Sequence, residues 1–177
     1  MIKVGFDLDG VLYNFVSSIY NYCRLYRGME ISYGEFAKNP DELTGQDVMN
    51  YLVTVPTIYE TGLPKQEDME SLHSLKNCEY FYITARPECV RLATEKFLAK
   101  NKFPDYQNLF MTKDKGVLSR LLQLNYYIDD MAKYVDKVSP TAKSFLLATP
   151  WNQKDREGRN VVSSIKEFIS YIGAEND

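Results

Sequence analysis

The sequence predicts an α/β protein in which a parallel sheet is flanked by helices and a small helical insertion follows the first strand. Two observations predict this fold. From residue 79 onward, short runs rich in β-branched and aromatic residues alternate with stretches of helical periodicity. Between residues 14 and 76 there is no strand pattern, and prolines and glycines separate short helical stretches. We therefore expect a core formed by residues 1–13 and 77–177, with residues 14–76 as a small helical cap.

The first strand is expected at residues 2–6, IKVGF, where apolar side chains alternate with others. Asp7 and Asp9 follow it, and Gly10, which permits positive φ, allows a sharp turn. Two carboxylates at the end of a buried strand repel each other and lose hydration, which is costly unless a cation or a reaction needs them. A polar strand end followed by a turn is the alternative. A calcium loop is excluded, because the fifth position counted from Asp7 is a valine.

The remaining elements follow from periodicity and composition. Helical patterns occupy residues 11–26, 44–51, 65–76, 88–100, 115–124, 131–137 and 162–172. Strand patterns occupy residues 79–84, 108–112, 126–129 and 144–149, whereas residues 150–160 are polar and loop-like. The single histidine, His73, is expected on the solvated face of a helix. One histidine cannot form a His-rich metal centre, and no GxSxG-like turn supports a Ser-His-Asp hydrolase.

The composition is that of an ordinary globular domain and excludes several classes of function. With 177 residues, a net charge of -3 and no basic cluster, the chain has no electrostatic case for binding polymeric nucleic acid. Cys23, Cys78 and Cys89 are far apart and form no CxxC pair, which indicates reduced thiols rather than a structural zinc site. Asp7 and Asp9 stand where a signal peptide needs its apolar core, and no run is long enough to span a membrane. We therefore expect a cytoplasmic protein without membrane contact.

Polar side chains recur where the predicted strands end, which is where ligands bind in parallel α/β sheets. These residues are Asp7, Asp9, Thr84, Lys113, Lys115, Asp129 and Asp130. Each has a structural alternative: Thr84 as a helix cap or strand hydroxyl, Lys115 as a solvated helix start, and the Asp129–Asp130 pair as a helix cap. Their recurrence at successive strand ends indicates one shared site.

Phosphoryl transfer through an aspartyl-phosphate uses this set of groups. Asp7 would attack phosphorus, while Asp129 and a main-chain carbonyl near Asp9 would hold a magnesium ion. Asp9 is placed to protonate the leaving oxygen and then to activate water. Thr84 and Lys115 would stabilise the oxygens of the transferring group, together with main-chain amides of the acidic loop.

Four ordered motifs resemble those of the haloacid-dehalogenase-like (HAD) phosphohydrolases. They are DLDGV at residues 7–11, ITAR at 83–86, the lysine that opens the helix at residue 115, and YIDD at 127–130. The resemblance implies a Rossmann-like core and an Mg²⁺ cofactor. It also implies Asp7 as nucleophile, Asp9 as acid and base, Thr84 and a lysine as phosphate binders, and Asp129 as a magnesium ligand assisted by Asp130. Lys115 is preferred to Lys113 as that lysine, because Lys113 is still in the loop.

Within this superfamily the chain resembles the 5'(3')-deoxyribonucleotidase branch. Shared features are the cap directly after the first motif, an aromatic residue after DGVL, the paired aspartates, and FLLATPWN at residues 145–152. Asn14 before Phe15, and ITARP in place of a serine-containing loop, depart from that branch. The resemblance makes Phe15 a candidate for stacking on a base, although its helical spacing fits core packing equally well. It assigns further substrate binding to Gly10, Ala85, Arg86 and Asn152, the last two at the phosphate or nearby scaffold.

The leading hypothesis is a magnesium-dependent phosphomonoesterase whose partner is a small phosphorylated substrate, a nucleoside monophosphate. A HAD phosphatase for a sugar phosphate or another small metabolite is the alternative with the same chemistry. A receiver-like phosphoacceptor is a different class, and the order of the acidic residues argues against it. A non-catalytic binding module is the third alternative, although every position needed for the chemistry is occupied by a suitable residue.

Overall fold

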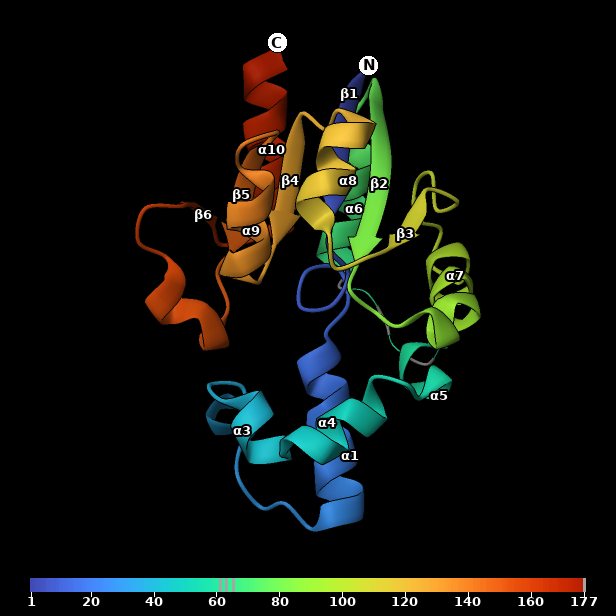
Figure 1. Ribbon diagram of the computed structural model, residues 1–177, viewed down its shortest axis with the longest axis vertical. Helices are drawn as coiled ribbons and strands as arrows, with labels where there is room; N and C mark the ends of the chain where they lie inside the picture. The colour runs from blue at the N-terminus through green and yellow to red at the C-terminus, as the bar shows by residue number, and fades with distance from the viewer. Residues whose placement is uncertain (61, 63, 65, 177) are drawn as a thin grey trace.

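A computed structural model of the protein describes residues 1–60, 62, 64 and 66–176, and it contains a six-stranded sheet (Figure 1). The strand order is β3-β2-β1-β4-β5-β6, and every neighbouring pair is parallel. The strands are β1 (Ile2–Phe6), β2 (Cys78–Thr84), β3 (Leu109–Met111), β4 (Tyr126–Asp129), β5 (Lys143–Leu147) and β6 (Asn160–Val162). The prediction of a parallel sheet flanked by helices is confirmed.

Helices cover both faces of the sheet and extend beyond one of its ends. The α-helices are α1 (Phe15–Arg27), α2 (Tyr33–Phe36), α3 (Pro40–Thr44), α4 (Gln46–Leu52), α5 (Pro56–Glu60), α6 (Gln66–Ser74), α7 (Arg91–Lys100), α8 (Lys115–Leu122), α9 (Ala132–Val138) and α10 (Ile165–Asn176). Two 3-10 helices are η1 (Glu88–Val90) and η2 (Pro150–Asp155). In Figure 1, α8 and α9 lie on one face of the sheet, whereas α6 and α10 contact each other on the other face.

Alternation along the strands divides the apolar residues between these two faces. On β2, Phe81 and Ile83 pack beneath α8 and α9, whereas Tyr80 and Tyr82 face the larger core on the α10 side. Phe6 of β1 stacks on Tyr80 with ring centroids 5.9 Å apart. The buried tyrosines keep their hydroxyl groups paired: Tyr80 donates to a main-chain carbonyl of α6, and Tyr82 donates to the carbonyl of residue 104. These rings are therefore buried without the free-energy cost of an unpaired hydroxyl group.

In its described part, the segment between β1 and β2 consists of helices α1 to α6 and the turns and loops that join them. Helices α1, α3, α4 and α5 lie beyond the carboxyl ends of the strands, whereas α6 returns to the sheet and contacts α10 (Figure 1). The predicted helix at 65–76 begins at a residue outside the described part, and 66–74 is helical with His73 exposed as expected. The division into a core and a cap of residues 14–76 stays a prediction. No helix in the described ranges is both long enough and apolar enough to cross a membrane.

Several boundaries differ from the sequence prediction. The helix expected from residue 162 begins at Ile165, and the stretch expected as one helix at 44–51 is divided between α3 and α4. The helix expected from residue 11 begins at Phe15, because the carbonyl of Leu8 accepts hydrogen bonds from the amides of Leu12 and Tyr13 and holds these residues in a turn. Asn14 then caps the helix, its side chain accepting a bond from the Ser17 amide. The expected loop at 150–160 contains η2 and the start of β6, a three-residue edge strand too short to show a period.

The two helical glycines of α8 and α10 give a test of packing. A Cβ on Gly116 would lie 2.4 Å from the carbonyl oxygen of Lys137, whereas a Cβ on Gly173 meets nothing within 4 Å. Gly116→Ala should lower the free energy of unfolding by about 1–3 kcal/mol through overpacking. Gly173→Ala should raise it by roughly 0.5–1 kcal/mol, because alanine favours a helix. Urea unfolding of both variants checks the pair, and equal effects would contradict the packing of α8 on α9.

Candidate active site at the carboxyl ends of the strands

A buried lysine joins the ends of two neighbouring strands. Lys115 opens α8, and its Nζ lies 2.6 Å from Oδ1 of Asp7 and 2.7 Å from Oδ2 of Asp129. Asp7 follows β1 and Asp129 ends β4, and these strands pair in parallel, so their carboxyl ends meet at one edge. Lys115 is 1% exposed and also lies over the ring of Tyr134, at 4.3 Å from its centroid. The ammonium group thus compensates two buried carboxylates.

The carboxylate of Asp129 accepts hydrogen bonds at both oxygens. Its Oδ2 accepts from Lys115 and from the hydroxyl of Tyr127, and its Oδ1 accepts from the amide of Met131 at 2.8 Å. Asp129 is fully buried. These contacts fix its orientation and make Asp129 the group that holds Lys115 in place.

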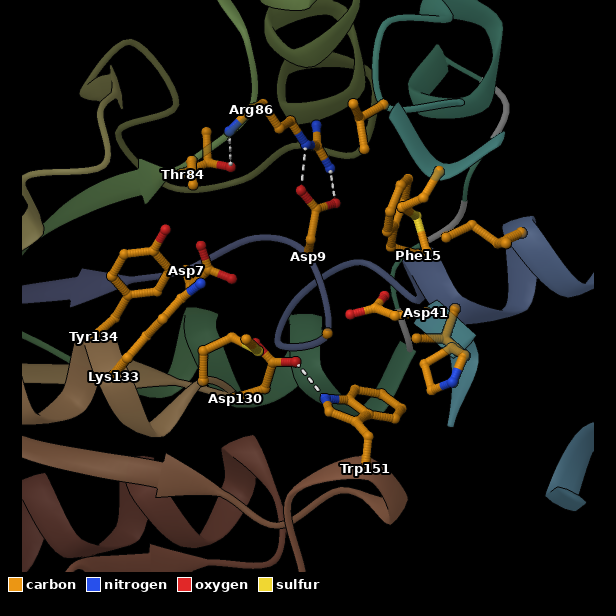
Figure 2. A pocket seen from close by; sticks show the side chains of 18 of the residues that line it. Asp7, Asp9, Phe15, Asp41, Thr84, Arg86, Asp130, Lys133, Tyr134 and Trp151 are labelled. Carbon is orange, nitrogen blue, oxygen red and sulfur yellow. Dashed lines mark hydrogen bonds and ion pairs between the residues drawn. The ribbon is translucent and has the colours of Figure 1, made fainter. Parts of the chain in front are cut away.

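Asp130, the next residue, is held from three sides. The indole Nε1 of Trp151 donates to Oδ2 of Asp130 at 2.7 Å (Figure 2), and the Asn152 side chain donates to the Asp130 carbonyl at 2.8 Å. On the third side lies Gly10, whose φ is +83°. A Cβ on Gly10 would lie 2.2 Å from Oδ2 of Asp130, so both the turn and the close approach require glycine here.

The three carboxylates at this edge offer a suitable set of ligands for a divalent cation. One oxygen each from Asp7, Asp129 and Asp130 lies within 4.8 Å of the others. Burial raises the pKa of Asp7 to about 7, with Lys115 opposing and the charges of Asp129 and Asp9 adding to the rise. Burial, followed by the charges of Asp129 and Asp7, raises the pKa of Asp130 well above its usual value. Hard oxygen donors crowded in this way fit a cation that would neutralise them.

Asp9 lies apart from these three carboxylates and pairs with Arg86. Nε and Nη2 of Arg86 donate to the two Asp9 oxygens at 2.9 and 2.7 Å (Figure 2). The remaining Nη1 donates to Thr94 Oγ1 at 3.0 Å, and the Tyr59 ring of α5 lies 4.1 Å from the guanidinium carbon. Arg86 is 5% exposed. With three of its nitrogens engaged, Arg86 serves here as the scaffold of Asp9.

The other predicted residues line or support the same cavity, which has a volume of about 1210 Å³ and is bounded by both the sheet edge and the insertion. Thr84 is fully buried there and accepts a bond from the Arg86 amide. Phe15 faces the cavity and also stacks on Tyr59, with centroids 5.7 Å apart. Asn152 is buried and bonded to Asp130, Leu147 and Thr149, so it supports the loop. Gly10, Ala85 and Lys113 also line the cavity, and Lys113 is exposed.

Solved structures share this architecture over nearly the whole chain. A HAD family hydrolase from Deinococcus radiodurans, with bound phosphate and sodium, matches with a TM-score of 0.69 and 14% identity, covering 98% of this chain and 96% of its own. The L-2-haloacid dehalogenase from Xanthobacter autotrophicus, with chloropropionic acid covalently bound, matches with a TM-score of 0.62 and 10% identity, covering 98% and 99%. This chain has the HAD fold.

Sequence comparison also finds a relative of this chain. The protein named "Putative nucleotidase OB0422" from Oceanobacillus iheyensis is 24% identical over 165 residues, which cover 83% of this chain and 86% of that protein. No protein-family model matches the chain. The resemblance to HAD proteins is thus confirmed for the fold, and the nucleotidase branch stays a prediction.

Several residues of this candidate site could not be identified from the sequence pattern. Tyr127 lies two residues before Asp129 within YIDD, yet strand periodicity alone does not show that its hydroxyl reaches the Asp129 carboxylate. Trp151 and Tyr59 come from a loop-like stretch and from the insertion, where spacing carries no signal about contacts at the site. For Trp151 the sequence offered one clue, because it is the single tryptophan of the chain and stands beside Asn152.

Replacement of Lys115 tests the charge balance of the candidate site. Lys115→Met leaves Asp7 and Asp129 as uncompensated buried carboxylates, and breaking a buried ion pair on one side costs about 3–5 kcal/mol. Urea unfolding should show a loss of that size. The matched control Lys113→Met removes an exposed charge and should change the free energy of unfolding by less than about 0.5 kcal/mol. Equal stability of the Lys115 variant and the wild type would contradict the balance described.

Proposed function

We propose that the protein hydrolyses phosphate monoesters through a phosphorylated Asp7, with Mg²⁺ as cofactor. The observation that carries this proposal is the buried cluster in which Lys115 bridges Asp7 and Asp129 beside Asp130. A nucleophilic carboxylate, a fixed cation and a ligand set for a metal ion are what transfer of a charged phosphoryl group requires. Similarity to the HAD hydrolase with bound phosphate supports the proposal.

In the first step, an oxygen of Asp7 attacks phosphorus and the ester P–O bond breaks. Asp9 gives its proton to the leaving oxygen, so the alcohol departs neutral. Because Asp9 is paired with Arg86, its side chain must leave the guanidinium group to reach that oxygen. Lys115 and Thr84 stabilise the negative charge on the transferring group.

In the second step, water attacks phosphorus of the phosphorylated Asp7. Asp9, now ionised, takes a proton from the water, and the bond between phosphorus and the Asp7 oxygen breaks. Inorganic phosphate leaves and Asp7 regains its carboxylate. Asp9 is again protonated, so atoms and charge balance over the cycle.

Asp7 and Asp130 are proposed as the side-chain ligands of the metal ion. Asp129 accepts three hydrogen bonds and holds Lys115, so it is better suited to position the lysine than to bind the ion. This assignment modifies the sequence expectation, which gave the main role to Asp129 and an assisting role to Asp130. When bound, Mg²⁺ would neutralise the crowded carboxylates and the substrate phosphate.

Dehalogenation is the competing activity among proteins of this fold, and the local chemistry does not favour it. A halide leaves without a proton, so that reaction has no use for an acid beside the nucleophile. Asp9 is two residues from Asp7 at the mouth of the same cavity. Asp7, Asp129 and Asp130 also concentrate negative charge that a neutral carbon centre would not require.

We further propose a nucleoside monophosphate as substrate. The cavity extends from the carboxylates to the insertion. Phe15 and Met49 of the insertion and Trp151 of η2 contribute apolar surface, and Gln46 and Asn50 contribute amide groups. A base can stack on an aromatic ring while its edge bonds to amides, and the cavity exceeds what phosphate alone needs. The relative named as a nucleotidase supports the same substrate class.

The nucleophile is tested by Asp7→Asn. Phosphate release in the presence of Mg²⁺ should fall at least about a thousandfold, because an amide cannot replace the attacking carboxylate. Circular dichroism should show a folded protein. Asp136→Asn is the control, because Asp136 is exposed, pairs with Arg159 and does not line the cavity, and this variant should keep wild-type turnover. Unchanged turnover by the Asp7 variant would contradict the covalent mechanism.

The substrate class is tested with a panel of phosphomonoesters assayed for phosphate release. Nucleoside monophosphates should be hydrolysed with kcat/KM at least about tenfold above that for ribose 5-phosphate and phosphoglycolate, because only they carry a base for the apolar wall. Phe15→Leu should reduce that preference. Equal or better turnover of base-free substrates would replace the nucleotide assignment with a general metabolite phosphatase.

A further inference from the structure

Trp151 is the single tryptophan of the chain, and it lies directly beside a proposed metal ligand. Its indole Nε1 donates to Oδ2 of Asp130 at 2.7 Å, as Figure 2 shows. We propose that Trp151 is a positioning residue, which fixes the Asp130 carboxylate for a divalent cation and reports cation binding through its fluorescence. This inference rests on the metal site of the proposed function.

The hydrogen bond restrains a carboxylate that would otherwise rotate. Asp130 is buried, and its Oδ2 lies between the indole N–H and the backbone of Gly10, where there is no room for a Cβ. An N–H group on one oxygen sets the plane of the carboxylate and therefore the direction in which its lone pairs point toward Asp7. Partners of this kind orient metal ligands and tune their affinity.

Hydrogen bonds of the neighbouring Asn152 hold the segment that carries Trp151. Asn152 donates to the carbonyls of Asp130 and Leu147, both at 2.8 Å, and accepts from the amide of Thr149 at 3.0 Å. Residues 151 and 152 together therefore hold both the side chain and the main chain of Asp130. Packing alone would not require the polar edge of the indole to face a carboxylate.

The indole ring also connects the metal site to the insertion. Trp151 is half-buried and packs against the apolar cluster that includes Val16 and Ile19 of α1 and Leu52 of α4. Its N–H end faces Asp130, and its apolar body therefore faces the insertion. A displacement of α1 would move the ring and with it the hydrogen bond to the carboxylate.

Calorimetric titration of the full chain with MgCl₂ tests the role of the N–H group. Trp151→Phe keeps an aromatic ring but removes the donor, and it should weaken Mg²⁺ binding by about 10-fold or more. Met29→Leu is the matched control, because Met29 packs against the same cluster but does not line the cavity, and the change conserves volume. It should bind Mg²⁺ as the wild type does. Wild-type affinity in the folded Trp151 variant would overturn the proposal.

A second measurement needs no change at Trp151. Titrating the wild type with MgCl₂ should change the tryptophan fluorescence saturably, with the dissociation constant found by calorimetry, and Asp130→Asn should abolish that change. Cation binding without any change in fluorescence would overturn the proposal. Hydrolysis is assayed separately: Mg²⁺ binding that depends on Trp151, in a protein that releases no phosphate from any monoester, would contradict the proposed function and leave this inference standing.

Discussion

The contact between the Lys115 ammonium group and the carboxylates of Asp7 and Asp129 is the interaction on which the site depends. All three side chains are buried, and an unpaired charge in such surroundings is strongly unfavourable. The charges of Asp129 and Asp7 raise the pKa of Lys115 against the lowering caused by burial, so the ammonium form persists. Lys115 can therefore keep Asp7 near an acidic neighbour without forcing either group out of the site. Buried ion pairs rarely maximise stability, which agrees with the reactive role that we propose for Asp7 and Lys115.

Sheet topology brings these groups together from distant parts of the chain. Strand β1 lies between β2 and β4, so the residues after all three strands meet at one edge. That edge holds two groups of acidic side chains: Asp7, Asp129 and Asp130 beside Lys115, and Asp9 paired with Arg86. The insertion reaches both groups, through Tyr59 over Arg86 and through the apolar cluster against Trp151. The insertion is therefore connected to both groups of carboxylates through direct side-chain contacts.

Sequence patterns predicted those parts of the structure that depend on residues close together in the chain, namely the strands and the acidic residues that follow them. Short β-rich runs identified the central strands, and the position of acids after them located the sheet edge, because carboxyl ends of parallel strands always coincide. The start of α1 was missed, because the turn at residues 8–13 depends on hydrogen bonds to one carbonyl, which periodicity does not encode. The roles of Arg86 and Asn152 as scaffold also depended on contacts between segments far apart in the chain. The sequence identified Arg86 and Asn152 as candidate site residues, but only the folded structure shows which groups their side-chain nitrogens bind.

Phosphorylation of Asp7 is the step on which the proposed mechanism depends, and mass spectrometry tests it most directly. Asp9→Asn should slow breakdown of the phosphorylated protein, because the group that activates water is lost. Acid quenching of this variant after mixing with a nucleoside monophosphate and MgCl₂ should give a peptide that contains Asp7 and carries one added phosphoryl group. That group should be absent when Asp7→Asn is added to the same variant. A phosphoryl group on another residue, or substrate turnover with no phosphorylated Asp7 at any time, would contradict the account.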